Sequence, residues 1–131
     1  MTDRESGRIA SIPFNGWSRQ ALLERGKMCT SRRERKKEYG EVGDYFYVVD
    51  RHRIKAILRL PLWFVKEFLY QTEGARSPEE FVAVWETIHT KTGYVPEQEV
   101  WVYFFSNPKV RGSDEKVYPA FDSPRLVRGP L

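Results

Sequence analysis

The chain has 131 residues and a mass of 15.5 kDa, which is enough for one domain with its own hydrophobic core. A single cysteine, Cys29, excludes an internal disulfide and, with the polar start of the sequence, leads us to expect a cytoplasmic protein without a signal peptide. The longest apolar stretches, near residues 60–70 and 100–105, are too short or too charged to cross a bilayer. No membrane-spanning segment is therefore expected.

Positive charge is concentrated in one segment. The net charge is +4, yet residues 19–37 hold eight basic and two acidic residues, a net charge of +6, so the rest of the chain sums to −2. A local basic patch on a near-neutral body indicates a polyanionic partner such as nucleic acid. A solvated charged loop is the other interpretation, and the charge pattern by itself leaves both open.

The first predicted helix covers the sequence RQALLER. Ser18 is the expected N-cap, and Gly26 is the expected left-handed stop at the C-terminal end. Residues 28–32 then leave this stop as an extended segment.

Two β-rich runs follow. Turn-forming residues at 40–44 lead into YFYVV at 45–49, which is rich in β-branched and aromatic side chains. Residues 53–60 alternate between apolar and basic side chains, which predicts a strand with one buried face. Residues 50–52 are expected to join the two strands as a hairpin turn.

Two helices and a last strand complete the pattern. Pro61 ends the alternating strand, and apolar residues at helical spacing predict a helix over residues 62–71. The sequence SPEE at 77–80 has the form of a capping box and predicts a second helix, which Gly93 is expected to end. The sequence EVWVYFF at 99–105 predicts the closing strand.

This order of elements predicts an α+β fold, in which a small, mostly antiparallel sheet or β-barrel is flanked by helices. We expect the folded domain to cover residues 13–106. Residues 1–12 are expected to be a flexible N-terminus, and residues 107–131, rich in proline and glycine, an irregular C-terminal arm.

The order of motifs resembles the ASCH domain, a member of the PUA-like β-barrel superfamily. The resemblance covers residues 13–105. It rests on the helix stop at Gly26, the pattern Lys27-x-x-Thr30-x-Arg32, the Gly43-Asp44 turn, the Glu73-Gly74 pair, the helix opened by SPEEF and the aromatic closing strand.

The resemblance implies a PUA-like barrel with a cleft between barrel and helices that holds RNA or a nucleotide-like ligand. We therefore expect an RNA-binding module. Some bacterial members are small amidohydrolases that deacetylate N4-acetylcytidine, and their catalytic set is similar to Lys27, Thr30 and Glu73 here. An amidohydrolase acting on an acylated nucleoside is thus the alternative function.

The basic segment supplies the candidate anion-binding residues. Thr30 and Arg32 are two positions apart, so in an extended segment both face one side and can address one anion or carbonyl. Arg33 must then face the opposite side, and we expect Arg32 alone to line the cleft. Trp17, which follows Asn15-Gly16, is the candidate platform for a stacked base. The candidate set for nucleic-acid or anion binding is Lys27, Arg32, Arg33, Arg35, Lys36 and Trp17.

The candidate catalytic residues are Lys27, Thr30 and Glu73. In the amidohydrolase hypothesis Lys27 is the base, Thr30 the nucleophile and Glu73 a proton carrier that orients Lys27. Each also has an ordinary structural interpretation, as a surface lysine, a strand threonine and a solvent-exposed glutamate.

No metal site and no cofactor are expected. His52 lies in the expected hairpin turn and His89 near a helix end, and neither has a second ligand at metal-binding spacing. The sequence also lacks a glycine-rich phosphate loop and a nucleophile-elbow motif.

Overall fold

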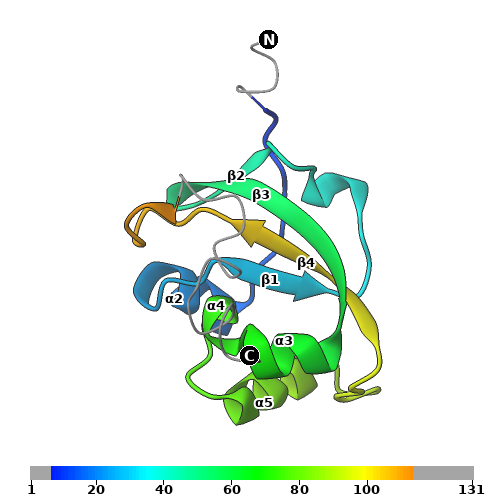
Figure 1. Ribbon diagram of the computed structural model, residues 1–131. Coiled ribbons are helices and arrows are strands. Elements are labelled where there is room, and N and C mark those ends of the chain that lie inside the picture. Colours follow the sequence, from blue (N-terminus) through cyan, green and yellow to red (C-terminus); the bar gives the residue numbers. More distant parts are fainter. Residues whose placement is uncertain (1–6, 114–131) are drawn as a thin grey trace, which may run out of the picture.

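The computed structural model describes residues 7–113, and the predictions for residues 1–6 and 114–131 lie outside it. The chain forms helices and strands in the order shown in Figure 1. The elements are α2 (Gly16–Glu24), β1 (Cys29–Arg32), the 3-10 helix η1 (Lys37–Tyr39), β2 (Tyr45–Val48), β3 (Asp50–Pro61), α3 (Leu62–Phe68), α4 (Tyr70–Glu73), α5 (Pro78–Ile88) and β4 (Glu99–Phe105).

The four strands form one curled sheet in the order β1-β4-β3-β2, with every neighbouring pair antiparallel. Helices α3, α4 and α5 gather below the sheet in the view of Figure 1. The expected α+β fold with a small antiparallel sheet flanked by helices is confirmed, and the curled sheet has the form of a half-barrel.

The hydrophobic core has two parts because the pairing of β3 with β4 shifts by a residue within the strand. Ile54 and Ala56 should face one side of a regular strand, but the pairing with β4 shifts between them. Ile54 packs in a cluster with Phe46 and Phe105, whereas Ala56 packs in another cluster with Phe104. The second cluster lies against the helices, so β4, in which residues 102–105 are all buried, is covered on both faces.

The segment before α2 is held against the sheet. Ala10 N donates to Tyr45 O at 2.7 Å, and the side chains of Ala10 and Ile12 are buried. In residues 7–12 the prediction of a flexible N-terminus therefore differs from the structure, because apolar side chains anchor this stretch. The first residue of the expected C-terminal arm is also anchored, since the Asn107 side chain donates to Leu22 O and Lys27 O at 3.1 and 2.9 Å.

Helix α2 begins earlier than predicted. Asn15, not Ser18, is its N-cap, and the Asn15 side chain accepts from Ser18 N at 2.8 Å. Asparagine and serine cap helices about equally well, so N-cap preference alone does not distinguish Asn15 from Ser18. The predicted stop is present, because Gly26 has a φ of +71°.

Three further boundaries differ from the predictions. The strands β2 and β3 meet at Val49, with a φ of +66°, so residues 50–52 belong to β3 and His52 is buried. The predicted helix over 62–71 is divided into α3 and α4 at Leu69. Helix α5 begins as predicted, with Ser77 accepting from Glu80 N at 3.0 Å, but it ends at Ile88 instead of near Gly93.

The helices within residues 7–113 are all too short or too polar to span a bilayer.

Candidate ligand-binding pocket

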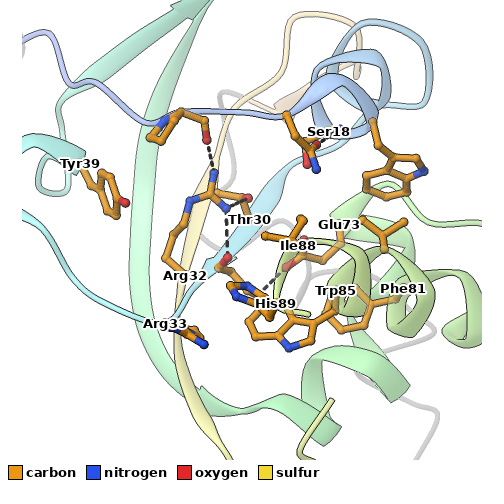
Figure 2. A pocket seen from close by; sticks show the side chains of 15 residues that line it. Ser18, Thr30, Arg32, Arg33, Tyr39, Glu73, Phe81, Trp85, Ile88 and His89 are labelled. Carbon is orange, nitrogen blue, oxygen red and sulfur yellow. Dashed lines mark hydrogen bonds between the residues drawn. The ribbon is translucent and has the colours of Figure 1, made fainter. Parts of the chain in front are cut away.

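A pocket of about 250 Å³ opens between the end of β1, the start of α2 and helix α5. Figure 2 shows Thr30 and Arg32 on one side of this pocket, Phe81 and Trp85 on the other, and Glu73 between them. The lining residues are Pro13, Asn15, Trp17, Ser18, Thr30, Ser31, Arg32, Arg33, Tyr39, Glu73, Phe81, Val84, Trp85, Ile88 and His89.

The apolar wall comes from one face of α5. Phe81 and Trp85 are buried, their rings stack at 6.2 Å, and Ile88 lies one turn further on with about half of its surface exposed. Helical spacing places these side chains on one stripe. The wall is therefore a continuation of the hydrophobic core that reaches solvent at the pocket.

A close approach between α4 and α2 sets the position of Glu73. Glu73 is the last residue of α4, and Gly74 follows with a left-handed φ of +101°. A Cβ atom at Gly74 would lie 2.6 Å from Ala21 Cβ, so only glycine fits here without displacement. Met28 N also donates to Thr72 O at 2.8 Å, which ties the end of α4 to the segment that enters β1.

Lys27 and Glu73 form a buried ion pair. Lys27 Nζ lies 3.1 Å from Glu73 Oε1 and donates to the Glu73 backbone carbonyl at 2.7 Å, and both residues are less than 5% exposed. Two of the predicted catalytic residues are thus brought together. The Lys27 charge is used inside the protein, since the carboxylate neutralises it below the pocket surface.

Ser31 is the hydroxyl that meets Glu73. Its Oγ donates to Glu73 Oε2, on the side of the carboxylate away from Lys27. Sequence reasoning missed Ser31, because alternation along a strand places it on the face opposite Thr30. Both side chains are nevertheless buried, since β1 is covered on both faces, and a short strand of this kind gives no local signal for that.

Thr30 and Arg32 share one face, as their spacing predicted. Arg32 Nη1 donates to Thr30 Oγ1 at 2.7 Å and to Ser31 O at 3.0 Å, and Nη2 donates to Pro13 O. Burial lowers the pKa of Arg32, although the Glu73 charge opposes this, and a guanidinium stays charged at neutral pH. The pocket therefore has a fixed positive group at one end.

Arg33 also lines the pocket, so the prediction that only one of the two arginines could do so is wrong. Strand β1 ends at Arg32, and alternation no longer fixes the direction of the next side chain. Arg33 Nη1 donates to Thr92 Oγ1 at 3.3 Å, near the end of α5. Among residues 7–113, no carboxylate forms an ion pair with Arg32 or Arg33.

His89 also lines the pocket, although the sequence pattern predicts no binding role for it. Its ring lies 4.1 Å from the Trp85 ring. Burial lowers the pKa of His89, and the charges of Arg33 and Arg32 lower it further. The imidazole is accordingly neutral at pH 7, and it offers one donor and one acceptor to a ligand.

The other predicted binding residues, Trp17, Arg35 and Lys36, lie at the edge of the pocket or outside it. Trp17 lines the pocket but is half-buried, and Arg25 and Lys27 lie over its ring at 5.0 and 5.9 Å. Arg35 forms an ion pair with Glu41, and its guanidinium lies over the Trp101 ring. Arg35 and Lys36 are both exposed, and neither lines the pocket.

No three His, Cys, Asp or Glu side chains gather as a metal-binding group in the part of the chain that the structure describes. Cys29 is fully buried, and burial together with the nearby Glu73 charge raises the pKa of its thiol. Cys29 is therefore a neutral packing residue at pH 7.

No protein-family model, curated protein or solved structure matches this chain.

Proposed function

We propose that this protein is an RNA-binding module of the ASCH, PUA-like kind, whose pocket takes up a single unstacked nucleotide. The base lies against the apolar wall formed by Phe81, Trp85 and Ile88. The phosphate lies at the opposite end, against Arg32 and Arg33.

The observation that carries this proposal is the combination of an aromatic wall with two guanidinium groups that no described carboxylate neutralises. Unstacked bases bind to aromatic side chains, and arginine forks suit phosphate oxygens. Lys27 is committed to Glu73, so the phosphate contacts fall to Arg32 and Arg33. The exposed Lys36 and Arg35 follow along the chain and would face neighbouring phosphates of a longer RNA.

Titration with nucleoside monophosphates at low salt tests the proposal, with tryptophan fluorescence as the readout because Trp17 and Trp85 line the pocket. Arg33→Ala should weaken binding about tenfold, the effect of one lost charge-assisted contact. Arg35→Ala is the matched control, since Arg35 is also exposed but lies outside the lining. Absence of binding to the unmodified protein, or equal losses in both variants, would contradict the proposal.

A small amidohydrolase acting on an acylated nucleoside such as N4-acetylcytidine is the second candidate, because Thr30 and Glu73 line one pocket and Lys27, although outside the lining, is bonded to Glu73 beneath it. The hydrogen bonds divide the roles differently from the sequence-based hypothesis. Lys27 is bonded to Glu73, and Thr30 is bonded to Arg32. Glu73 is then the proton acceptor, Lys27 orients it, and Ser31 is the hydroxyl within its reach.

A further inference from the structure

The outer face of the β2–β3 hairpin carries two tyrosines opposite two arginines. Tyr45 pairs with Arg53, and Tyr47 pairs with Arg51, in the antiparallel register. The residues between them, Phe46 and His52, are buried in the core. Alternation therefore places all four on the face that points away from the core.

Ring and guanidinium groups are in contact on this face. The Arg51 and Arg53 guanidinium carbons lie 4.8 and 5.2 Å from the centre of the Tyr45 ring. The Tyr47 ring lies 6.4 Å from the Tyr45 ring, and 55% of the Tyr47 surface is exposed. Tyr45 thus holds the arginines in place and leaves Tyr47 open for a further planar group.

The positive charge of this face adjoins a hollow of about 330 Å³. Arg51 and Arg53 line it with Asp50, Ser106 and Ser113, and Pro108 completes the lining. Within residues 7–113, Arg51 forms no ion pair with a carboxylate. Besides Asp50, the acidic residue near this face is Asp44, whose carboxylate accepts from the backbone N–H groups of Arg8 and Glu41. The face therefore carries the exposed Tyr47 ring beside the Arg51 guanidinium.

We propose that this hairpin face is a second contact site for single-stranded RNA, with one base stacked on Tyr47 and an adjacent phosphate bound by Arg51. None of the four residues lines the pocket described above, so the two sites are separate. The choice of RNA as the ligand rests on the proposed function. An exposed ring next to a guanidinium is the arrangement that binds single strands without sequence preference, because every base has a face to stack and every link a phosphate.

The test compares a single nucleotide with a strand long enough to reach both sites. Cytidine monophosphate and a mixed-sequence RNA of about twelve nucleotides are titrated into the full chain at several salt concentrations. The double variant Tyr47→Ala/Arg51→Ala should bind the longer RNA about tenfold more weakly and bind cytidine monophosphate unchanged. Its slope of log affinity against log salt should be shallower by about 0.7, the value for one phosphate contact on a single strand.

A matched control and a rescue keep the test independent of folding. Trp63→Ala/Arg59→Ala removes an exposed ring (44%, against 55% for Tyr47) and an exposed arginine near the other end of β3, and its RNA affinity should stay within about twofold of the original. Tyr47→Phe keeps the ring and should retain the affinity for the longer RNA.

The outcomes separate the two proposals. If cytidine monophosphate fails to bind but the longer RNA depends on Tyr47 and Arg51, the pocket proposal fails and the hairpin site stands. If the longer RNA binds equally well to the hairpin variant and the original chain, the hairpin site is overturned, and a protein partner for this face becomes the better interpretation.

Discussion

The ammonium of Lys27 is bonded twice to a residue 46 positions away, to the backbone carbonyl of Glu73 at 2.7 Å and to its carboxylate at 3.1 Å. The first bond satisfies a carbonyl at the end of α4, and the second neutralises a buried charge. Ser31 binds the other carboxylate oxygen, so Glu73 is held on both sides. Because burial is nearly complete, this group contributes to the fold as well as to the pocket.

Removing one partner of this pair should destabilise the protein strongly. Lys27→Met leaves an uncompensated buried carboxylate and should cost about 3 to 5 kcal/mol in the free energy of unfolding. The double variant Lys27→Met/Glu73→Leu should lose less than the two single losses added together, since no charge is then left unpaired. Urea denaturation followed by circular dichroism measures the free energy of unfolding of the double variant and of the two single variants, Lys27→Met and Glu73→Leu.

The exposed pair between Arg59 and Glu99 is the control for that series. Its atoms lie 2.7 Å apart, but both side chains are more than half exposed. Glu99→Gln should therefore change the free energy of unfolding by less than about 1 kcal/mol. A Lys27→Met effect as small as that of Glu99→Gln would show that water reaches the Lys27–Glu73 pair.

Gly74→Ala should displace Glu73. The positive φ alone costs about 1 to 3 kcal/mol for a residue with a Cβ, and the new atom would also meet Ala21 at 2.6 Å. We expect a lower free energy of unfolding and weaker nucleotide binding. Gly16→Ala is the matched control, because a Cβ at Gly16, the first residue of α2, has no neighbour within 4 Å and should be neutral or slightly stabilising.

Local patterns predicted the elements better than they predicted the site. The capping residues at 77–80 and the strand over residues 53–60 each depend on neighbours in sequence, and the structure has both, although the register shift between Ile54 and Ala56 interrupts the predicted single buried face. The pairing of Lys27 with Glu73 joins two distant segments, and no periodicity encodes it. The sequence pointed to it only through the family resemblance.

The curled sheet explains why the sequence pattern did not predict Ser31 as a site residue. Alternation predicts one buried and one exposed face, but β1 has core on both sides, so Ser31 and Thr30 are buried together. The end of α5 was missed for a different reason. Its C-cap is His89, without a glycine to mark the position, and Gly93 gave a stop signal five residues beyond Ile88.

Stability should fall as the pH decreases through the histidine range. Burial lowers the pKa of His52 below its usual value of 6.5, outweighing the backbone carbonyls of Ser106 and Val48, which raise it. The unfolded chain then binds a proton at higher pH than the folded chain does. The free energy of unfolding should therefore decrease as the pH falls below about 6.5, by at most about 1.4 kcal/mol per pH unit for this group.

The variant His52→Phe tests this assignment. It keeps a ring against Phe46 and Phe105 but cannot titrate, so its stability should depend less on pH between about pH 7 and about pH 5.5. His89→Gln should remove a further part, because burial also lowers the pKa of His89. An unchanged slope in the double variant would assign the pH dependence to carboxylates instead.

The two adjacent hydroxyls of β1 should have different effects on amide hydrolysis, if the second candidate function holds. Ser31 donates to Glu73 and can pass its proton there as its oxygen attacks the carbonyl carbon of the acetyl group. Glu73 then gives that proton to the cytidine amine as the amide C–N bond breaks, and water hydrolyses the acetyl ester on Ser31. Ser31→Ala should therefore lower kcat about a hundredfold or more. Thr30 instead accepts from Arg32, so Thr30→Val should loosen that guanidinium and mainly raise KM. Cytidine release from N4-acetylcytidine, followed by chromatography, measures both. The reverse pattern would assign the nucleophile to Thr30, and no release by the unmodified protein would remove the hydrolase function.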